Sequence, residues 1–259
     1  MREVADGVFC VTGTAVNWVV VRSGRDVTLI DGGYPRDVGA VEASIRSVGA
    51  RPEDLRAVLL THAHADHLGG PAVLHSRYGV PVLTGAREAA HARREFLEQV
   101  SPAQVVIRSW QPRWALWGVR IIAAGALSHA SVPSAQDYDG LLGADGALDL
   151  PGGPVPIPCA GHTSGHTAYH LPGAGVLVSG DALVTGHELW GWAGPRLLPA
   201  PFAHDPEAAF DTLDALAATG AGVLVPGHGD PWEGDLRDAV TEARGHVRRE
   251  ERAGRTRRA

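Results

Sequence analysis

The chain has 259 residues and no lysine, so all 23 of its basic side chains are arginines. The absence of lysine excludes every mechanism that depends on a lysine amine. Cysteine is also scarce, because Cys10 and Cys159 are the only two. Two cysteines are too few for a disulfide framework, and neither belongs to a CxxC pair, so both are expected to be reduced thiols.

Long apolar segments are lacking as well. The first residues, MREVADGVFCV, do not contain the apolar core of a signal peptide, and no run approaches the roughly 18 apolar residues that cross a membrane. We therefore expect a cytoplasmic protein without a membrane partner. The net charge of −6 argues against a nucleic-acid partner, whose phosphates would need a basic face. The basic segment 245–259 is the exception and is expected to be a frayed helical tail.

Length and pattern predict one domain over residues 1–259. The segments VFCVTG, AVNWVVV and DVTLIDGG predict three strands before the first helix, and strands alternate with helices after them. From residue 155 onward the same order returns. This repeated order predicts an α/β (α+β) fold in which two sheets pack face to face with helices outside.

The middle of the chain, residues 101–150, has the least regular pattern. It carries Trp110, Trp114 and Trp117 among short strand-like pieces, followed by the polar loop SHASVPSAQDYDG. We expect this segment to be an irregular insert or a lid, preceded by a helix over residues 87–100.

The densest group of metal-ligand side chains lies in THAHADHLGG, residues 61–70, directly after a predicted buried strand. Residues two apart in an extended segment point the same way, so His62 and His64 can hold one cation. Asp66 and His67 fall on the following turn and face a neighbouring position. The motif can therefore supply ligands to two metal ions.

Three more ligand candidates follow apolar strands later in the chain. His162 follows VPIPCA, Asp181 follows GVLVSG and His228 follows GVLVPG, and each has a glycine beside it. Such strand ends can lie on one rim of the sheets. Imidazole and carboxylate together suit Zn²⁺, with iron or manganese as alternatives, and the carboxylate of Asp181 is the natural bridge between two ions.

Two bridged cations predict hydrolysis. A water held between them loses a proton near neutral pH and becomes a nucleophile, and the same ions polarise a carbonyl or phosphoryl oxygen. No side-chain nucleophile is required.

The motifs HxHxDH, GHTSGH, SGD and PGHG, in this order, resemble those of the metallo-β-lactamase superfamily of hydrolases over about residues 8–230. The resemblance implies a four-layer αββα sandwich of two mixed sheets. It implies that Asp31, in LIDGG, supports the ligand loop from outside, while His166 is expected to stabilise its own loop without binding metal. The implied ligands are His62, His64 and His162 for the first metal, Asp66, His67 and His228 for the second, and Asp181 as the bridge.

The departures from this pattern narrow the activity. β-Lactamases of the cysteine-ligand class lack the histidine at position 67 and carry cysteine in place of Asp181, and iron-dependent oxygen reductases carry glutamate where this chain has Ala63. Only residues 229–259 follow His228, which argues against the helical domain with which glyoxalase II binds glutathione.

The expected function is a zinc-dependent hydrolase with two divalent ions. Asp66 and Asp181 would orient a metal-bridging hydroxide that attacks an ester-type bond (ester, thioester or lactone) of a small apolar or aromatic molecule. The alternatives are an iron-dependent oxidoreductase of the persulfide dioxygenase type, a phosphodiesterase, and a binding protein that keeps the fold without catalysis.

The segment after Asp181 is expected to be a loop, and its aromatic residues are candidates for the wall of the substrate pocket. They are His187, Trp190 and Trp192. The three tryptophans of residues 101–150 are candidates for the opposite wall or for a contact in a homodimer. Cys159 is expected to be simply buried.

Overall fold

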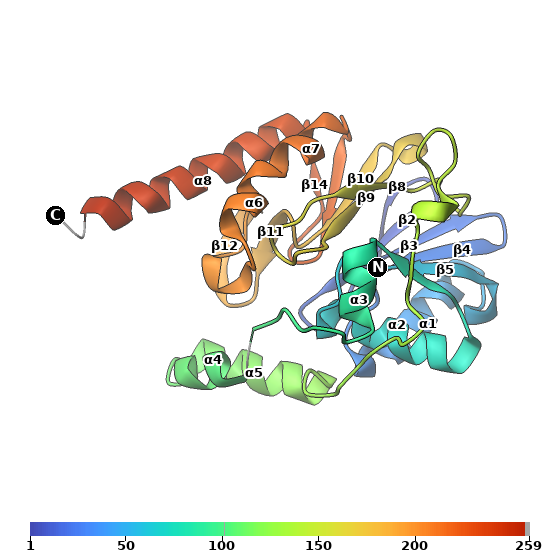
Figure 1. Cartoon of the computed structure of the whole chain (residues 1–259), viewed down its shortest axis with the longest axis horizontal. Helices are drawn as coiled ribbons and strands as arrows, with labels where there is room; N and C mark the ends of the chain where they lie inside the picture. Colours follow the sequence, from blue (N-terminus) through green and yellow to red (C-terminus); the bar gives the residue numbers. More distant parts are fainter. Residues whose placement is uncertain (101, 257–259) are drawn as a thin grey trace.

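The computed structural model describes residues 1–100 and 102–256, with side chains for 1–100 and 103–250. Its architecture is mixed α/β, with two main sheets, a separate β-hairpin and outer helices (Figure 1). The helices are α1 (Val38–Ser47), α2 (Ala65–Tyr78), α3 (Ala86–Ala92), α4 (Pro102–Arg108), α5 (Pro112–Ala124), α6 (Pro206–Asp211), α7 (Leu213–Ala218) and α8 (Leu236–Thr256).

The first sheet is antiparallel at its β1 edge and parallel from β4 onward. Its β-branched residues favour strands. The connections explain the strand directions, because short turns join β2 to β4 as antiparallel neighbours, while α1 connects β4 to β5 and α2 connects β5 to β6 as parallel neighbours. Its strands, in sheet order, are β1 (Arg2–Ala5), β2 (Val8–Thr12), β3 (Asn17–Ser23), β4 (Asp26–Ile30), β5 (Leu55–Leu59), β6 (Val82–Thr84) and β7 (Gln136–Asp137).

The second sheet is also mixed, with β10 and β13 parallel and the other neighbours antiparallel. Its strands, in sheet order, are β14 (Trp232–Glu233), β13 (Val223–Pro226), β10 (Val176–Gly180), β9 (Thr167–Leu171) and β8 (Val155–Pro158). The separate hairpin consists of β11 (Val184–His187) and β12 (Trp190–Arg196), and α8 packs against β12.

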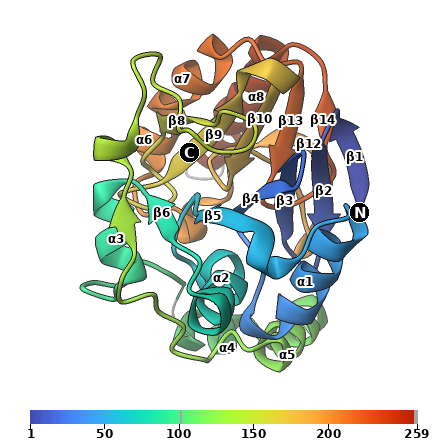
Figure 2. The same ribbon diagram turned by 90° about the vertical axis from the view of Figure 1, so that its right-hand side faces the viewer.

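Alternate side chains of each strand face different layers. On β3, Val19 points into the core between the sheets, whereas Val20 belongs to the core beneath α1 and α2. On β10, Val178 faces the first sheet and Leu177 faces α7 and α8. Figure 2 shows the resulting order of helices, sheet, sheet and helices. The predicted αββα sandwich of two mixed sheets is confirmed.

Several local predictions were wrong. Residues 102–108 and 112–124 form α4 and α5, not an irregular insert, although most of 125–150 has no regular structure. The predicted helix over residues 87–100 ends at Ala92. The segment after Asp181, expected to be a loop, forms the hairpin of β11 and β12. The helix predicted for the basic tail, in contrast, is present as far as Thr256, and the last residues of the tail, 257–259, lie outside the described residues.

No helix in the described part of the chain is both long enough and apolar enough to cross a membrane.

Candidate metal centre

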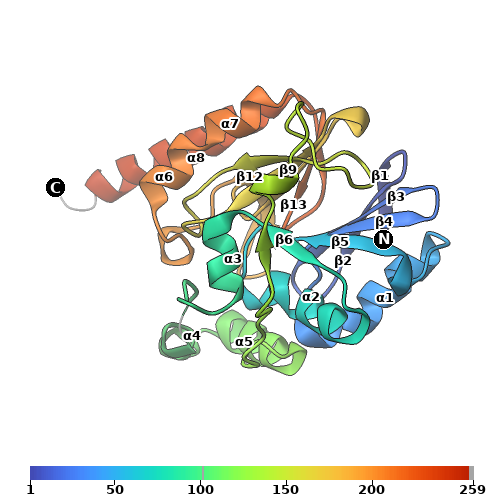
Figure 3. The same cartoon turned by 45° about the vertical axis from the view of Figure 1, so that its right-hand side comes forward.

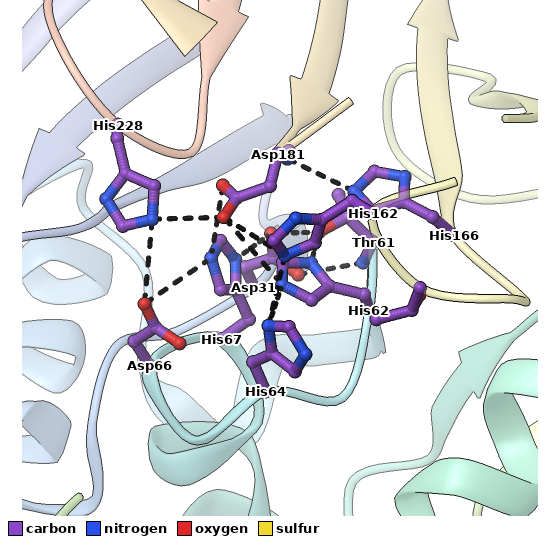
Figure 4. Close-up of polar contacts among 12 residues, drawn as sticks. Asp31, Thr61, His62, His64, Asp66, His67, His162, His166, Asp181 and His228 are labelled. Carbon is purple, nitrogen blue, oxygen red and sulfur yellow. Dashed lines mark hydrogen bonds and ion pairs between the residues drawn. The ribbon is translucent and has the colours of Figure 1, made fainter. Parts of the chain in front are cut away.

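Strand ends of both sheets bring the seven predicted ligands together (Figure 4). His62 follows β5 of the first sheet, and α2 begins immediately after His64, so that Asp66 and His67 lie in the first helical turn. The second sheet supplies the other three from the segments after β8, β10 and β13, namely His162, Asp181 and His228.

Three imidazole nitrogens converge in the first group. Nδ1 of His64 lies 3.1 Å from Nε2 of His62 and 3.0 Å from Nε2 of His162. The other ring nitrogen of His64, Nε2, donates a hydrogen bond to the carbonyl of Glu98. In His62 it is Nδ1 that donates, to Thr61 Oγ1 at 3.1 Å, because that hydroxyl gives its own proton to Asp31.

These assignments leave lone pairs of His62 and His64 facing each other without a proton between them. Burial lowers the pKa of all three imidazoles of this group, most strongly for His62 and His162. They are therefore neutral at pH 7. Lone pairs of neutral imidazoles pointing at one place form a donor set that fits a divalent cation.

The second group contains one carboxylate and two imidazoles. Oδ2 of Asp66 lies 3.9 Å from Nε2 of His67 and 3.6 Å from Nε2 of His228. Each histidine uses its other ring nitrogen as an outward donor, since Nδ1 of His67 lies 2.8 Å from Asp31 Oδ2 and Nδ1 of His228 lies 2.7 Å from the carbonyl of Ala15. Both Nε2 atoms are thus turned toward Asp66.

Asp181 lies between the two groups. Its Oδ2 is 3.4 Å from His162 Nε2 and 3.1 Å from His228 Nε2, and its Oδ1 is 3.5 Å from His67 Nε2. Oδ1 of Asp181 and Nε2 of His67 are both buried without a hydrogen-bond partner. Unpartnered buried polar atoms are costly, so these two fit a ligand that the protein itself does not supply.

The carboxylates set the charge of the second group. Burial lowers the pKa of His67, but the negative charges of Asp31, Asp66 and Asp181 outweigh burial and raise the pKa well above its usual value. The pKa of His228 is raised in the same way, against burial, chiefly by Asp181. Burial raises the pKa of Asp181, but the charges of His228 and His67 hold it well below its usual range.

Strained backbone supports the ligand loops. Asp31, Ala15 and Arg94 are the non-glycine residues with φ near +60° in the described part of the chain. All three contact the centre or its loops: Asp31 accepts from Thr61 and His67, Ala15 accepts from His228, and Arg94 donates to the carbonyl of Ala63 at 2.9 Å. Such conformations cost free energy and concentrate at functional sites. Asp31 thus lies where the sequence pattern predicted a supporting carboxylate.

A buried pair that the sequence did not reveal lies beneath the first group. Glu88 and His91, on α3, are fully buried and joined at 2.6 Å. Glu88 Oε1 also accepts from the backbone N–H of Ala63, and its Oε2 accepts from Thr163 Oγ1 at 2.8 Å. Since Ala63 lies between two candidate ligands and Thr163 follows a third, Glu88 connects the two loops that carry them. Nothing in REAAHARRE distinguishes this glutamate from a surface residue of a helix.

Replacing Glu88 by alanine should weaken metal binding at the first group by about 10- to 100-fold, because the loops lose their common acceptor. Glu88→Gln keeps most of the shape and should lose less. A competition titration with a chromophoric chelator measures the affinity, with the exposed Glu53 mutated to alanine as the control. Unchanged affinity in Glu88→Ala would show that the loops hold their positions without this contact.

An apolar cavity of about 260 Å³ opens onto the centre. Its floor includes His64, Asp66, Asp181 and His228, and the α4–α5 hairpin forms one wall. No arginine lines it among the described residues. Its apolar lining includes Val105, Trp117, Ile121, Leu198 and Phe202.

The structure places only one of the three predicted pocket residues in the lining of this cavity. His187 lines it, with its ring centroid 5.0 Å from that of His228, and burial lowers the pKa of His187 to about 3. Trp190 packs behind His187, with 4.8 Å between the ring centroids. Trp192 stacks on Trp190, with 6.3 Å between their ring centroids.

The three tryptophans of the insert also differ in position. Trp117 lines the cavity, Trp114 is buried beside it, and Trp110 is exposed. Only Trp117 therefore lies where the opposite wall of the pocket was predicted.

The loop after β8 orients Asp181 from outside the ligand groups. His166 Nε2 accepts from the backbone N–H of Asp181 at 3.1 Å, so its Nδ1 carries the proton and faces Cys159 Sγ at 3.2 Å. Cys159 is buried, and burial raises the pKa of its thiol to about 12. A second cavity, of about 140 Å³, reaches His162 and Asp181 from the side of α8, with Arg196 in its lining.

An αββα sandwich that gathers five histidines and two aspartates at the strand ends of both sheets has the architecture of a metal-dependent hydrolase. The family model of the metallo-beta-lactamase superfamily matches residues 11–228, and the chain belongs to this superfamily. The resemblance seen in the motifs is thereby confirmed.

Relatives with curated descriptions agree with this membership. The chain is 27% identical to the probable metallo-hydrolase YflN of Bacillus subtilis (strain 168), in a match that covers 93% of this chain and 90% of that protein. It is 30% identical to the hydroxyacylglutathione hydrolase of Rhodobacter capsulatus over 70% of this chain, and spans about half of that relative, 51%.

Solved structures share the fold. A metallo-β-lactamase family protein from Thermus thermophilus superposes with a TM-score of 0.66 at 22% identity, covering 97% of this chain and 82% of that one. A metallo-β-lactamase from Cronobacter sakazakii superposes with a TM-score of 0.64 at 19% identity, covering 98% of this chain and 95% of that one.

Proposed function

We propose that this chain is a dinuclear metal-dependent hydrolase that cleaves an ester-type bond (ester, thioester or lactone) in a small, largely apolar molecule. The observation that carries the proposal is the convergence of two ligand groups that share Asp181 at the floor of an apolar cavity. The ligand types favour Zn²⁺. The first ion would be held by His62, His64 and His162, the second by Asp66, His67 and His228.

Two divalent cations bound there would acidify a water molecule and polarise the scissile carbonyl. The residues of the chain would position these reactants. The carboxylates of Asp66 and Asp181 both face the cavity and are suited to accept hydrogen bonds from the attacking water and so to fix its orientation. The outward hydrogen bonds of the histidines fix the orientation of each ring, so that its ligating nitrogen faces the centre.

The two cavities support an ester-type substrate. The larger one is apolar and suits an acyl group, and the smaller one, on the side of α8, can take the other half of the molecule. Both reach Asp181, so a bond lying across the two openings would be held over the ligand groups. The hydroxyacylglutathione hydrolases among the relatives keep thioesters within the proposed class.

The test combines elemental analysis with turnover on protein purified without added metal or chelator. About two zinc ions per chain, together with cleavage of p-nitrophenyl esters, acyl thioesters or lactones, would support the proposal. Asp66→Ala should fold normally and lose most of this turnover.

Other outcomes would contradict the proposal. About one iron per chain with oxygen consumed on thiol substrates would identify an oxidoreductase. Preferential cleavage of bis-p-nitrophenyl phosphate would identify a phosphodiesterase. Bound ligand without turnover in the metal-loaded protein would identify a binding protein.

A further inference from the structure

The hairpin of α4 and α5 has two apolar faces. The inner face contributes Val105, Trp117 and Ile121 to the cavity above the metal centre. The outer face is turned to solvent, and in Figures 1 and 3 the hairpin lies at the edge of the molecule, away from both sheets. A helix that is apolar on both sides is unusual at the surface of a soluble domain.

The segment that contains the hairpin carries most of the exposed large apolar side chains of the described residues. Of the eleven that the described part of the chain exposes, eight lie between Leu97 and Leu127. Isolated exposed apolar side chains are common, but a concentration of this kind marks an interaction surface. The outer surface of the hairpin is formed by four of them, which are 67% to 79% exposed: Ile107, Trp110, Leu116 and Val119. The exposed Val106, Ile122 and Leu127 instead line the cavity.

The charges on the hairpin are of one sign. Residues 99–136 contain no aspartate or glutamate, although the whole chain has a net charge of −6. Arg120 pairs with Glu188. Arg108 and Arg113 contact only neutral groups of their own hairpin among the described residues, with the guanidinium of Arg108 5.4 Å from the ring of Trp114.

We propose that the outer surface of the α4–α5 hairpin docks on an anionic lipid surface. Apolar side chains with a tryptophan would enter the boundary between head groups and acyl chains, and Arg108 and Arg113 would contact the anionic head groups. The charge pattern favours lipid over a second copy of the chain. In a symmetric dimer formed through this surface the same patch would face itself, and it offers no carboxylate to the arginines.

This docking differs from spanning a membrane. The expectation of no membrane partner rested on the lack of a spanning segment, which does not bear on a helix that lies on the surface. The docked hairpin would place the cavity above the metal centre next to the lipid boundary, where apolar esters accumulate. The docking itself is independent of the proposed reaction, because it involves none of the metal ligands.

Co-sedimentation of the full chain with vesicles tests the proposal. Vesicles of phosphatidylglycerol mixed with phosphatidylcholine should bind the protein, and binding should weaken as salt is added. Each arginine next to an anionic surface is worth roughly fivefold in partition, so Arg108→Gln combined with Arg113→Gln should weaken the partition by about 25-fold. Leu116→Ser combined with Val119→Ser should weaken it on both anionic and neutral vesicles.

Matched controls use residues of the same kind elsewhere on the surface. Arg25→Gln with Arg56→Gln, and Leu141→Ser with Leu142→Ser, should leave the partition unchanged. Failure of the native chain to bind anionic vesicles would overturn the proposal. So would a native dimer, seen by light scattering, that Leu116→Ser with Val119→Ser converts to a monomer while vesicle binding stays absent. All substituted side chains are solvent-exposed or partly exposed, and thermal melts verify that each variant folds.

Discussion

Replacing Asp181 by asparagine is expected to reduce kcat/KM by at least about 100-fold, or ~2.7 kcal/mol in transition-state stabilisation, and to reduce the metal content from about two ions per chain to about one. Asparagine preserves the shape of the side chain and the backbone N–H that donates to His166. It removes the negative charge that faces His162, His228 and His67 at 3.1 to 3.5 Å. A neutral amide cannot bridge two cations in the way a carboxylate can.

Elemental analysis and steady-state kinetics on one preparation measure both effects of Asp181→Asn. Asp214→Asn is the control, because that carboxylate is exposed and pairs with Arg244 far from the centre. An Asp181→Asn protein that keeps both ions and full turnover would exclude Asp181 as the bridge, and the division of the ligands into two groups would have to be revised.

The two ligand groups should bind metal with different pH dependence. The histidines of the first group have lowered pKa values and are already neutral at pH 7, so metal binding there releases no proton. His67 and His228 have raised pKa values and hold protons in the metal-free protein. A metal ion must displace these protons, so its apparent affinity for the second group should rise by about tenfold per pH unit for each proton displaced, up to the raised pKa values.

As the pH falls through the neutral range the protein should therefore lose the second ion first and keep the first. Calorimetric titration with Zn²⁺ in two buffers of different ionisation enthalpy measures the protons released in each binding step. Equal proton release in the two steps, or loss of both ions at the same pH, would contradict the assignment of the charges.

Sequence alone located the candidate ligands because each of them belongs to a local pattern. A short run of histidines follows a strand, and glycines flank the other three positions for a physical reason that the structure makes plain. At Gly227 a Cβ would lie 2.2 Å from Asp181 Oδ1, so a side chain there would collide with a ligand. The layers of the fold were predictable for the same reason, because strand and helix periods are local.

Other parts of the site depend on contacts between distant segments. Glu88 supports the ligand loops across more than one element, and its own sequence neighbours give no sign of this. Helix α5 was missed because its exposed face carries Leu116 and Val119 beside its arginines, while its buried face carries Trp114 and Ile121. With large apolar side chains on both faces, the helical alternation in the sequence is weak.

The candidate ligands of the centre come from both sheets, four from the first and three from the second. Metal ions bound there would link the two halves of the sandwich to each other. The free energy needed to separate the two halves would then increase with free metal, by about 2.7 kcal/mol at a concentration 100 times the dissociation constant. Hydrogen exchange or limited proteolysis would detect this as less frequent opening. Chains that fail to acquire their ions would open more often and be degraded sooner, so metal supply would set the lifetime of the protein as well as its activity.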